Sequence, residues 1–124
     1  MYNVTVLRGR LSSDPRPTPL GSGDLLVRYE VTVERSDGPA DSVPVAWIGP
    51  PRSAPPASLA TGDLVVVAGR VRRRWYRGRP GGARSVTEVL ATDVVPVRRR
   101  AVATRLVRAA LDVVGAAPDE GSAR

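Results

Sequence analysis

Apolar and polar residues alternate in five segments of this chain, and alternation with a period of two is typical of half-buried β-strands. The clearest segment is 25–35, where every second residue from Val27 to Val33 is apolar and the residues between them are charged or carry a hydroxyl group. The five segments that we predict to be strands are 2–11, 25–35, 43–48, 64–76 and 85–97. An all-β protein with five short strands indicates a small antiparallel barrel.

The segments between the predicted strands are rich in Pro, Gly and Asp. Three prolines and two glycines in 12–24 predict a loop, and Asp37-Gly38 predicts a hairpin turn between the second and third strands. Four prolines within 50–56 exclude a strand or a regular helix there, and 57–60 has room for at most one helical turn. The link between the third and fourth strands is therefore short.

The pattern changes after the fifth predicted strand. From 99 to 114 the apolar residues gather on one broad face at a period of 3.6, and Gly115 and Pro118 supply a stop. This predicts an added C-terminal amphipathic helix that either caps the barrel or pairs with a second copy; a membrane-surface helix is the remaining alternative. We expect a barrel domain over 1–97, the helix over 98–115 and a disordered tail over 116–124.

Composition narrows the chemistry that this chain can perform. All 19 basic residues are arginine, and the chain has no Lys, His or Cys. A zinc cluster, a Cys-His or Ser-His nucleophile pair and a Schiff-base lysine are thereby excluded, and the carboxylates form no convincing acid–base pair. We therefore predict no catalysis, no metal, no cofactor and no small-molecule substrate. Neither a signal peptide nor a membrane-spanning run is evident, so a cytoplasmic location is expected.

The excess positive charge is confined to one part of the chain. The net charge of the whole chain is +7, while 69–100 alone holds ten Arg against Glu88 and Asp93, a local charge of +8. A clustered basic block of this kind is the electrostatic signature of a protein that binds a polyanion.

Within the basic block, alternation along 71–76 places Arg72, Arg74 and Tyr76 on one face. Guanidinium groups neutralise phosphates and an aromatic ring stacks on a base, which is worth ~1–3 kcal/mol per base. Such a face suits a single nucleic-acid strand, because a duplex offers no exposed base face. We expect Trp75, on the opposite face, to fill the end of the core.

A basic loop follows this strand. Arg77, Arg79 and Arg84 flank Pro80-Gly81-Gly82, and we expect this loop to clamp the bound strand. The glycines form no P-loop, because the lysine of that motif and a following helix are missing.

Six short segments, in this order and spacing, resemble the bacterial single-stranded DNA-binding protein family over about 3–97. They are Gly9-Arg10-Leu11, Asp14-Pro15, Thr18-Pro19-Leu20-Gly21, Val43-Pro44-Val45-Ala46-Trp47, Thr61-Gly62-Asp63 and Thr87-Glu88-Val89. The resemblance implies a five-stranded OB-fold barrel that binds single-stranded DNA without sequence preference or catalysis. It further implies a homo-oligomer at the nucleoid that acts in DNA replication, recombination or repair. Tyr76 falls where this family places a stacking aromatic, and Arg72 and Arg74 fall on its DNA-facing side.

The chain also departs from the family. Ser42 and Ile48 occupy positions where the family often carries stacking aromatics, and the acidic, apolar C-terminal tip of the family is missing. The chain therefore resembles a divergent or accessory member. A protein-interaction OB module with incidental nucleic-acid contact and an RNA-binding protein are the alternatives.

Overall fold

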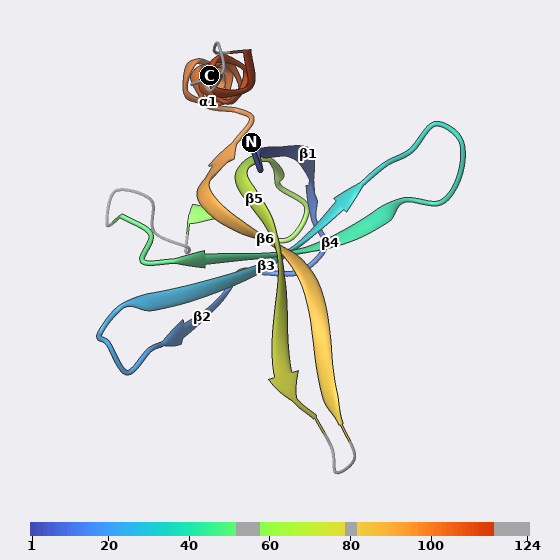
Figure 1. Ribbon diagram of the computed structural model, residues 1–124. Coiled ribbons are helices and arrows are strands. Elements are labelled where there is room, and N and C mark those ends of the chain that lie inside the picture. Colours follow the sequence, from blue (N-terminus) through green and yellow to red (C-terminus); the bar gives the residue numbers. More distant parts are fainter. Residues whose placement is uncertain (52–57, 79–81, 116–124) are drawn as a thin grey trace, which may run out of the picture.

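Five strands close into a barrel, and a sixth strand extends it at one edge (Figure 1). The computed structural model describes residues 1–51, 58–78 and 82–115. The elements are β1 (Thr5–Leu11), β2 (Arg16–Pro19), β3 (Leu25–Val33), β4 (Asp41–Ile48), β5 (Leu64–Arg77), β6 (Ala83–Pro96) and α1 (Arg100–Gly115). Hydrogen bonding follows the order β1-β5-β6-β4-β3, and pairing of β1 with β3 closes the ring. This arrangement confirms the predicted OB-fold barrel with an added C-terminal helix.

Two details of the sheet differ from the prediction. The segment 12–24, predicted to be a loop, contains β2, which pairs with β3 from Arg16 opposite Arg28 to Pro19 opposite Leu25. Its prolines are tolerated because β2 is an exposed edge strand, and a four-residue strand shows no alternation to detect. In addition, β4 and β6 pair in parallel, so the barrel is not wholly antiparallel.

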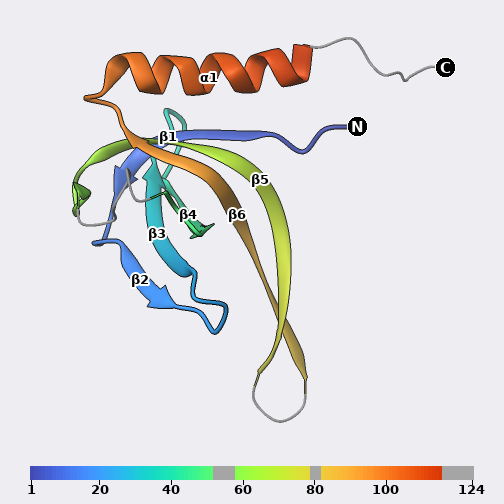
Figure 2. The ribbon, with the colours of Figure 1, turned by 90° about the vertical axis from the view of Figure 1, so that its left-hand side faces the viewer.

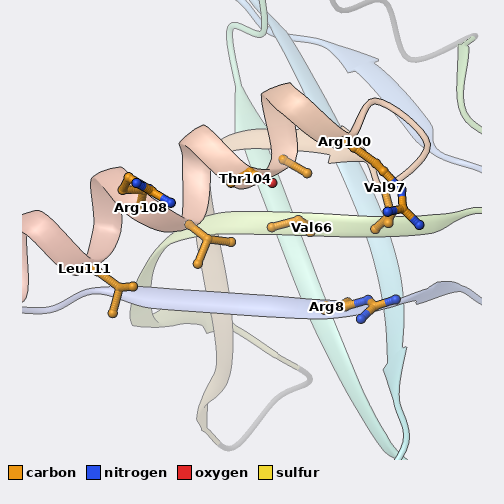
Figure 3. A pocket seen from close by; sticks show the side chains of 9 residues that line it. Arg8, Val66, Val97, Arg100, Thr104, Arg108 and Leu111 are labelled. Atoms are coloured by element: carbon orange, nitrogen blue, oxygen red, sulfur yellow. The ribbon is translucent and has the colours of Figure 1, made fainter.

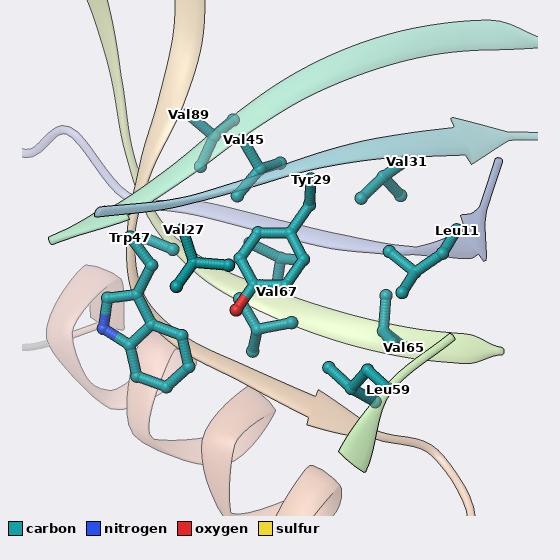
Figure 4. Packing of buried hydrophobic residues seen from close by; sticks show 12 residues of the cluster. Leu11, Val27, Tyr29, Val31, Val45, Trp47, Leu59, Val65, Val67 and Val89 are labelled. Atoms are coloured by element: carbon teal, nitrogen blue, oxygen red, sulfur yellow. The ribbon is translucent and has the colours of Figure 1, made fainter. Parts of the chain in front are cut away.

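The core is built from the inward faces of the ring strands (Figure 4). Of the four apolar positions of β3 that the alternation identified, Val27, Tyr29 and Val31 are fully or nearly fully buried, and Val33 is partly buried against the core. Val65 and Val67 of β5 face them from across the barrel. Burial disfavours the phenolate and raises the pKa of Tyr29 to about 12.

A carboxylate fastens two turns at one end of the barrel. Asp14 Oδ1 accepts hydrogen bonds from the backbone N–H and the hydroxyl of Thr61, both at 2.8 Å. These bonds favour the ionised form and lower the pKa of Asp14. Gly62, with φ of 93°, turns the chain into β5 in a conformation that favours glycine. The Asp14 and Thr61 segments quoted for the resemblance are thus in direct contact.

The C-terminal helix lies along the outside of the barrel, over β1 and β5 (Figure 2). Beneath it, Val66 and Ala68 of β5 are buried although they point away from the core. Ala103 is the buried residue of the helix, while Leu111 near its C-terminal end is exposed. The helix therefore covers one outer face of the barrel. In the part of the chain that the structure describes, no helix is long and apolar enough to span a bilayer.

Candidate nucleic-acid interface

The second half of β5 and the first half of β6 form a hairpin that extends beyond the barrel (Figures 1 and 2). Residues 65–68 are buried, whereas 70 and most of the residues that follow it in β5 are exposed. The change occurs at a bulge between Ala68 and Gly69. A Cβ on Gly69 would clash with the backbone carbonyl oxygen of Leu90, so only glycine permits this close approach of the two strands.

The pairing of β5 with β6 places the predicted binding residues side by side. Arg72 lies opposite Glu88, Arg74 opposite Val86, and Tyr76 opposite Arg84. Residues directly opposite each other in an antiparallel pair point to the same face. The prediction from alternation that Arg72, Arg74 and Tyr76 share a face is therefore confirmed, and β6 adds Glu88 and Arg84 to it.

Glu88 is the centre of this face. Its side chain is almost inaccessible to solvent, and one oxygen, Oε2, lies 2.8 Å from Nη2 and 2.9 Å from Nε of Arg72. The same oxygen is 3.4 Å from Nε of Arg74, and Oε1 is 3.7 Å from Nη1 of Arg28. We call these four residues the Glu88 cluster. One carboxylate against three guanidinium groups leaves a net charge of +2.

The buried carboxylate fixes the arginines without covering them. A buried charge must be paired to offset its desolvation, so Glu88 restrains the ends of the three side chains. Each guanidinium group has five N–H donors, and the three side chains keep between 27% and 40% of their surface exposed. Donors thus remain available to an anion outside the sheet.

Both aromatic residues of the hairpin are exposed. Tyr76 keeps 47% of its surface accessible, and the guanidinium carbon of Arg74 lies 5.7 Å from the centre of its ring. Trp75 points to the opposite face, is 63% exposed and has Arg73 at 5.9 Å. The prediction that Trp75 fills the core is wrong, because the hairpin has left the barrel at this point and no core lies beneath it.

The basic loop residues divide into three cases. Arg77 is exposed and is the last residue of β5. Arg84 is exposed too, but it belongs to β6 rather than to a loop, and its side-chain stem lies against Gly78. Arg79 lies outside the described residues.

Sequence reasoning missed two members of the site. Arg28 was recognised as a residue of the polar face of β3, but its approach to Glu88 depends on the parallel pairing of β4 with β6. Glu88 is one of only two acidic residues within 69–100, and that isolation was the available signal. The two positions where the family often carries stacking aromatics, Ser42 and Ile48, both lie on β4. Ser42 donates a hydrogen bond to Glu30, and Ile48 is 44% exposed.

The described residues show no cluster of metal ligands beside this surface. A barrel with a protruding hairpin that carries fixed guanidinium groups and exposed aromatic rings defines an OB-fold protein with the chemistry of a single-stranded nucleic-acid binder.

The chain belongs to the single-strand binding protein family, whose model matches residues 2–97. It is 35% identical over 99 residues to the single-stranded DNA-binding protein of Clostridium tetani, covering 74% of this chain and 68% of that protein. It is also 35% identical over 100 residues to single-stranded DNA-binding protein 2 of Staphylococcus aureus strain Mu50, covering 76% of this chain and 71% of that protein. The helix α1 lies outside the matched residues.

Proposed function

We propose that this protein binds single-stranded DNA without sequence preference and catalyses no reaction. The observation that supports this most strongly is the Glu88 cluster, a pre-positioned group of arginines with a net positive charge, on the same face as the exposed ring of Tyr76. The names of the relatives point to the same ligand.

The proposed mechanism combines phosphate neutralisation with base stacking. Arg28, Arg72 and Arg74 contact successive phosphates, and release of counterions from the strand drives binding. Tyr76 stacks on a base next to this track. A stacked ring accepts any base, so the site holds a strand unpaired whatever its sequence. We propose that this protection serves DNA replication, recombination or repair in the cytoplasm, at the nucleoid.

The end of the hairpin contributes further positive charge. Arg84 lies directly opposite Tyr76, and Arg77 is the neighbour of Tyr76 in the chain. We assign both residues, together with Arg79, to the contact with the strand, where they close over the phosphates that leave the Glu88 cluster.

We further propose that the protein is a homo-oligomer. In β1, Arg10 and Leu11 pair with β3, whereas the described strands leave one edge of Thr5–Arg8 unpaired. An open strand edge is a template for pairing with a second chain. The exposed Val6 adds apolar surface beside that edge.

The test of the function is a fluorescence-anisotropy titration of labelled oligo-dT at several salt concentrations, with duplex DNA and oligo-U as competitors. We expect oligo-dT to bind more tightly than duplex DNA. Each neutralised phosphate contributes about −0.7 to the slope of log affinity against log salt. The net charge of +2 in the cluster, with Arg77, Arg79 and Arg84, gives a slope of about −3.5.

Two results would redirect the proposal. Tighter binding of oligo-U than of oligo-dT would make RNA the ligand. Weak binding that ignores strandedness would favour the second candidate, a protein-interaction OB module. The specific observation in favour of that candidate is that Ser42 and Ile48 on β4 offer no aromatic ring for stacking.

A further inference from the structure

A pocket of about 450 Å³ lies between α1 and the outer face of the barrel, away from the hairpin (Figure 3). The helix and the strands beneath it form its walls. Nine residues line it, from β1, β5, the segment before α1 and α1 itself. Six of these nine come from α1, so the pocket depends on the part of the chain that lies beyond the family match.

Three arginines and no acidic residue line this pocket. Arg8, Arg100 and Arg108, which we call the pocket arginines, are all exposed. Within the described ranges, none of the three has a carboxylate within ion-pair distance, whereas the arginines of the hairpin share Glu88. The pocket therefore attracts anionic groups.

The middle of the pocket is apolar. Val66 of β5 forms its floor, and Ala103 and Val107 of α1 approach from the helix side. Figure 3 shows Arg8 and Arg100 at one end and Arg108 and Leu111 at the other. The ligand that complements this arrangement carries an apolar group between two negative charges.

The spacing of the pocket arginines defines that ligand further. Arg100 and Arg108 are eight residues apart on one helix, which is about 12 Å at ~1.5 Å per residue. An extended peptide rises ~3.3 Å per residue, so two side chains four positions apart span a similar length. In an extended chain, the side chains at the first, third and fifth positions point to the same side. An acidic–any–apolar–any–acidic segment therefore matches the pocket.

We propose that this pocket binds an extended acidic peptide segment with a central apolar side chain, supplied by a partner protein. A nucleic-acid strand fits less well, because no aromatic side chain lines the pocket and the polar edges of a base would face valine and alanine. This second site is separate from the proposed DNA interface, and it would recruit a partner to the barrel independently of the hairpin.

The test uses fluorescein-labelled peptides and the full chain. The probe is a glycine-spaced peptide with two glutamates four positions apart and a leucine midway between them. Two control peptides carry serine in place of the leucine, or glutamines in place of the glutamates. Burial of a leucine side chain is worth ~1.5–3 kcal/mol, so we expect the probe to bind at least about tenfold more tightly than the serine peptide. The glutamine peptide should bind more weakly and lose its dependence on salt.

Substitutions locate the site. Arg108→Gln should weaken binding of the probe about fivefold, as expected for loss of one exposed ionic contact. Arg105→Gln, which removes another exposed charge from the same helix outside the pocket, should leave binding unchanged. Val107→Ser, in the apolar middle of the pocket, should weaken binding of the leucine peptide but not of the serine peptide. Circular dichroism confirms that each variant is folded.

Two outcomes would overturn the proposal. Equal losses in Arg105→Gln and Arg108→Gln would show a general attraction to a basic surface. Displacement of the probe by oligo-dT, together with weaker oligo-dT binding by Arg108→Gln, would make the pocket part of the nucleic-acid path. Neither outcome bears on the hairpin, which the titration of oligo-dT tests separately.

Discussion

At the scale of single residues, Glu88 determines how the arginines of the proposed interface are held. An exposed arginine loses side-chain entropy when it binds a phosphate. Arg28, Arg72 and Arg74 are already restrained by one buried carboxylate, so part of that entropy is lost on folding rather than on binding. An acidic residue in a basic interface thereby supports binding of an anion.

Glu88→Gln tests this structural role. The substitution replaces a buried acceptor with an amide that cannot neutralise the guanidinium groups, so we expect the free energy of unfolding to fall by about 1–3 kcal/mol. Urea denaturation followed by circular dichroism measures the change. Glu34→Gln, at an exposed position, is the matched control, and its free energy of unfolding should stay close to that of the parent chain. Equal midpoints for the two variants would show that Glu88 does not hold the cluster together.

Tyr29 gives the barrel a defined response to alkaline pH. Its pKa is raised to about 12 in the folded state by burial, against about 10 in the unfolded chain. Between these values the unfolded state binds fewer protons than the folded state. The contribution of Tyr29 to the free energy of unfolding is therefore fully present below about pH 10 and is lost as pH rises toward 12. Across this pH range, the melting temperature should fall in the parent chain and in Tyr2→Phe, and it should fall less in Tyr29→Phe. The same decline in all three proteins would contradict the assignment.

At the scale of elements, alternation and turn chemistry predicted the five ring strands to within three residues at each end, and the helix to within two. The edge strand β2 was missed because four residues pairing through the backbone leave no side-chain pattern. The position of Trp75 was missed for a different reason. Alternation shows which residues share a face, but it does not show where a hairpin passes the end of the barrel.

The exposed Trp75 reports directly on what binds the second face of the hairpin. The chain has two tryptophans, and Trp47 is buried in the core, so Trp47→Phe leaves Trp75 as the one indole fluorophore. If the strand also stacks on this face, oligo-dT should quench the emission of Trp47→Phe. The complementary variant Trp75→Phe should show little change. Binding by anisotropy without quenching would restrict the strand to the Tyr76 face.

At the scale of the whole molecule, the strongly basic hairpin and the barrel face under α1 are separate surfaces. The region 69–100, with its local charge of +8, includes the hairpin that protrudes from the barrel. The helix α1 covers the outer face over β1 and β5, and no described strand pairs with one edge of Thr5–Arg8. The hairpin proposed to bind nucleic acid is therefore separate from the face under α1, where the open edge of β1 and the pocket lie side by side and share Arg8.

The open edge of β1 predicts self-association. Light scattering should give a mass of at least twice the 13.2 kDa of one chain. Val6→Glu places a charge beside the proposed interface, where two copies repel each other, and should shift the mass toward one chain. Val71→Glu adds the same charge on the hairpin and should leave the mass unchanged. A parent chain with the mass of a monomer would exclude this part of the proposal.

The most direct test of the account is the affinity of Tyr76→Ala for oligo-dT, measured by anisotropy beside Tyr2→Ala. Both side chains are about half exposed, but only Tyr76 lies beside the Glu88 cluster. We expect Tyr76→Ala to lose about 1–3 kcal/mol of binding free energy with an unchanged salt slope, and Tyr2→Ala to bind like the parent chain. Equal affinities for the parent chain and Tyr76→Ala would contradict a stacking face on the hairpin.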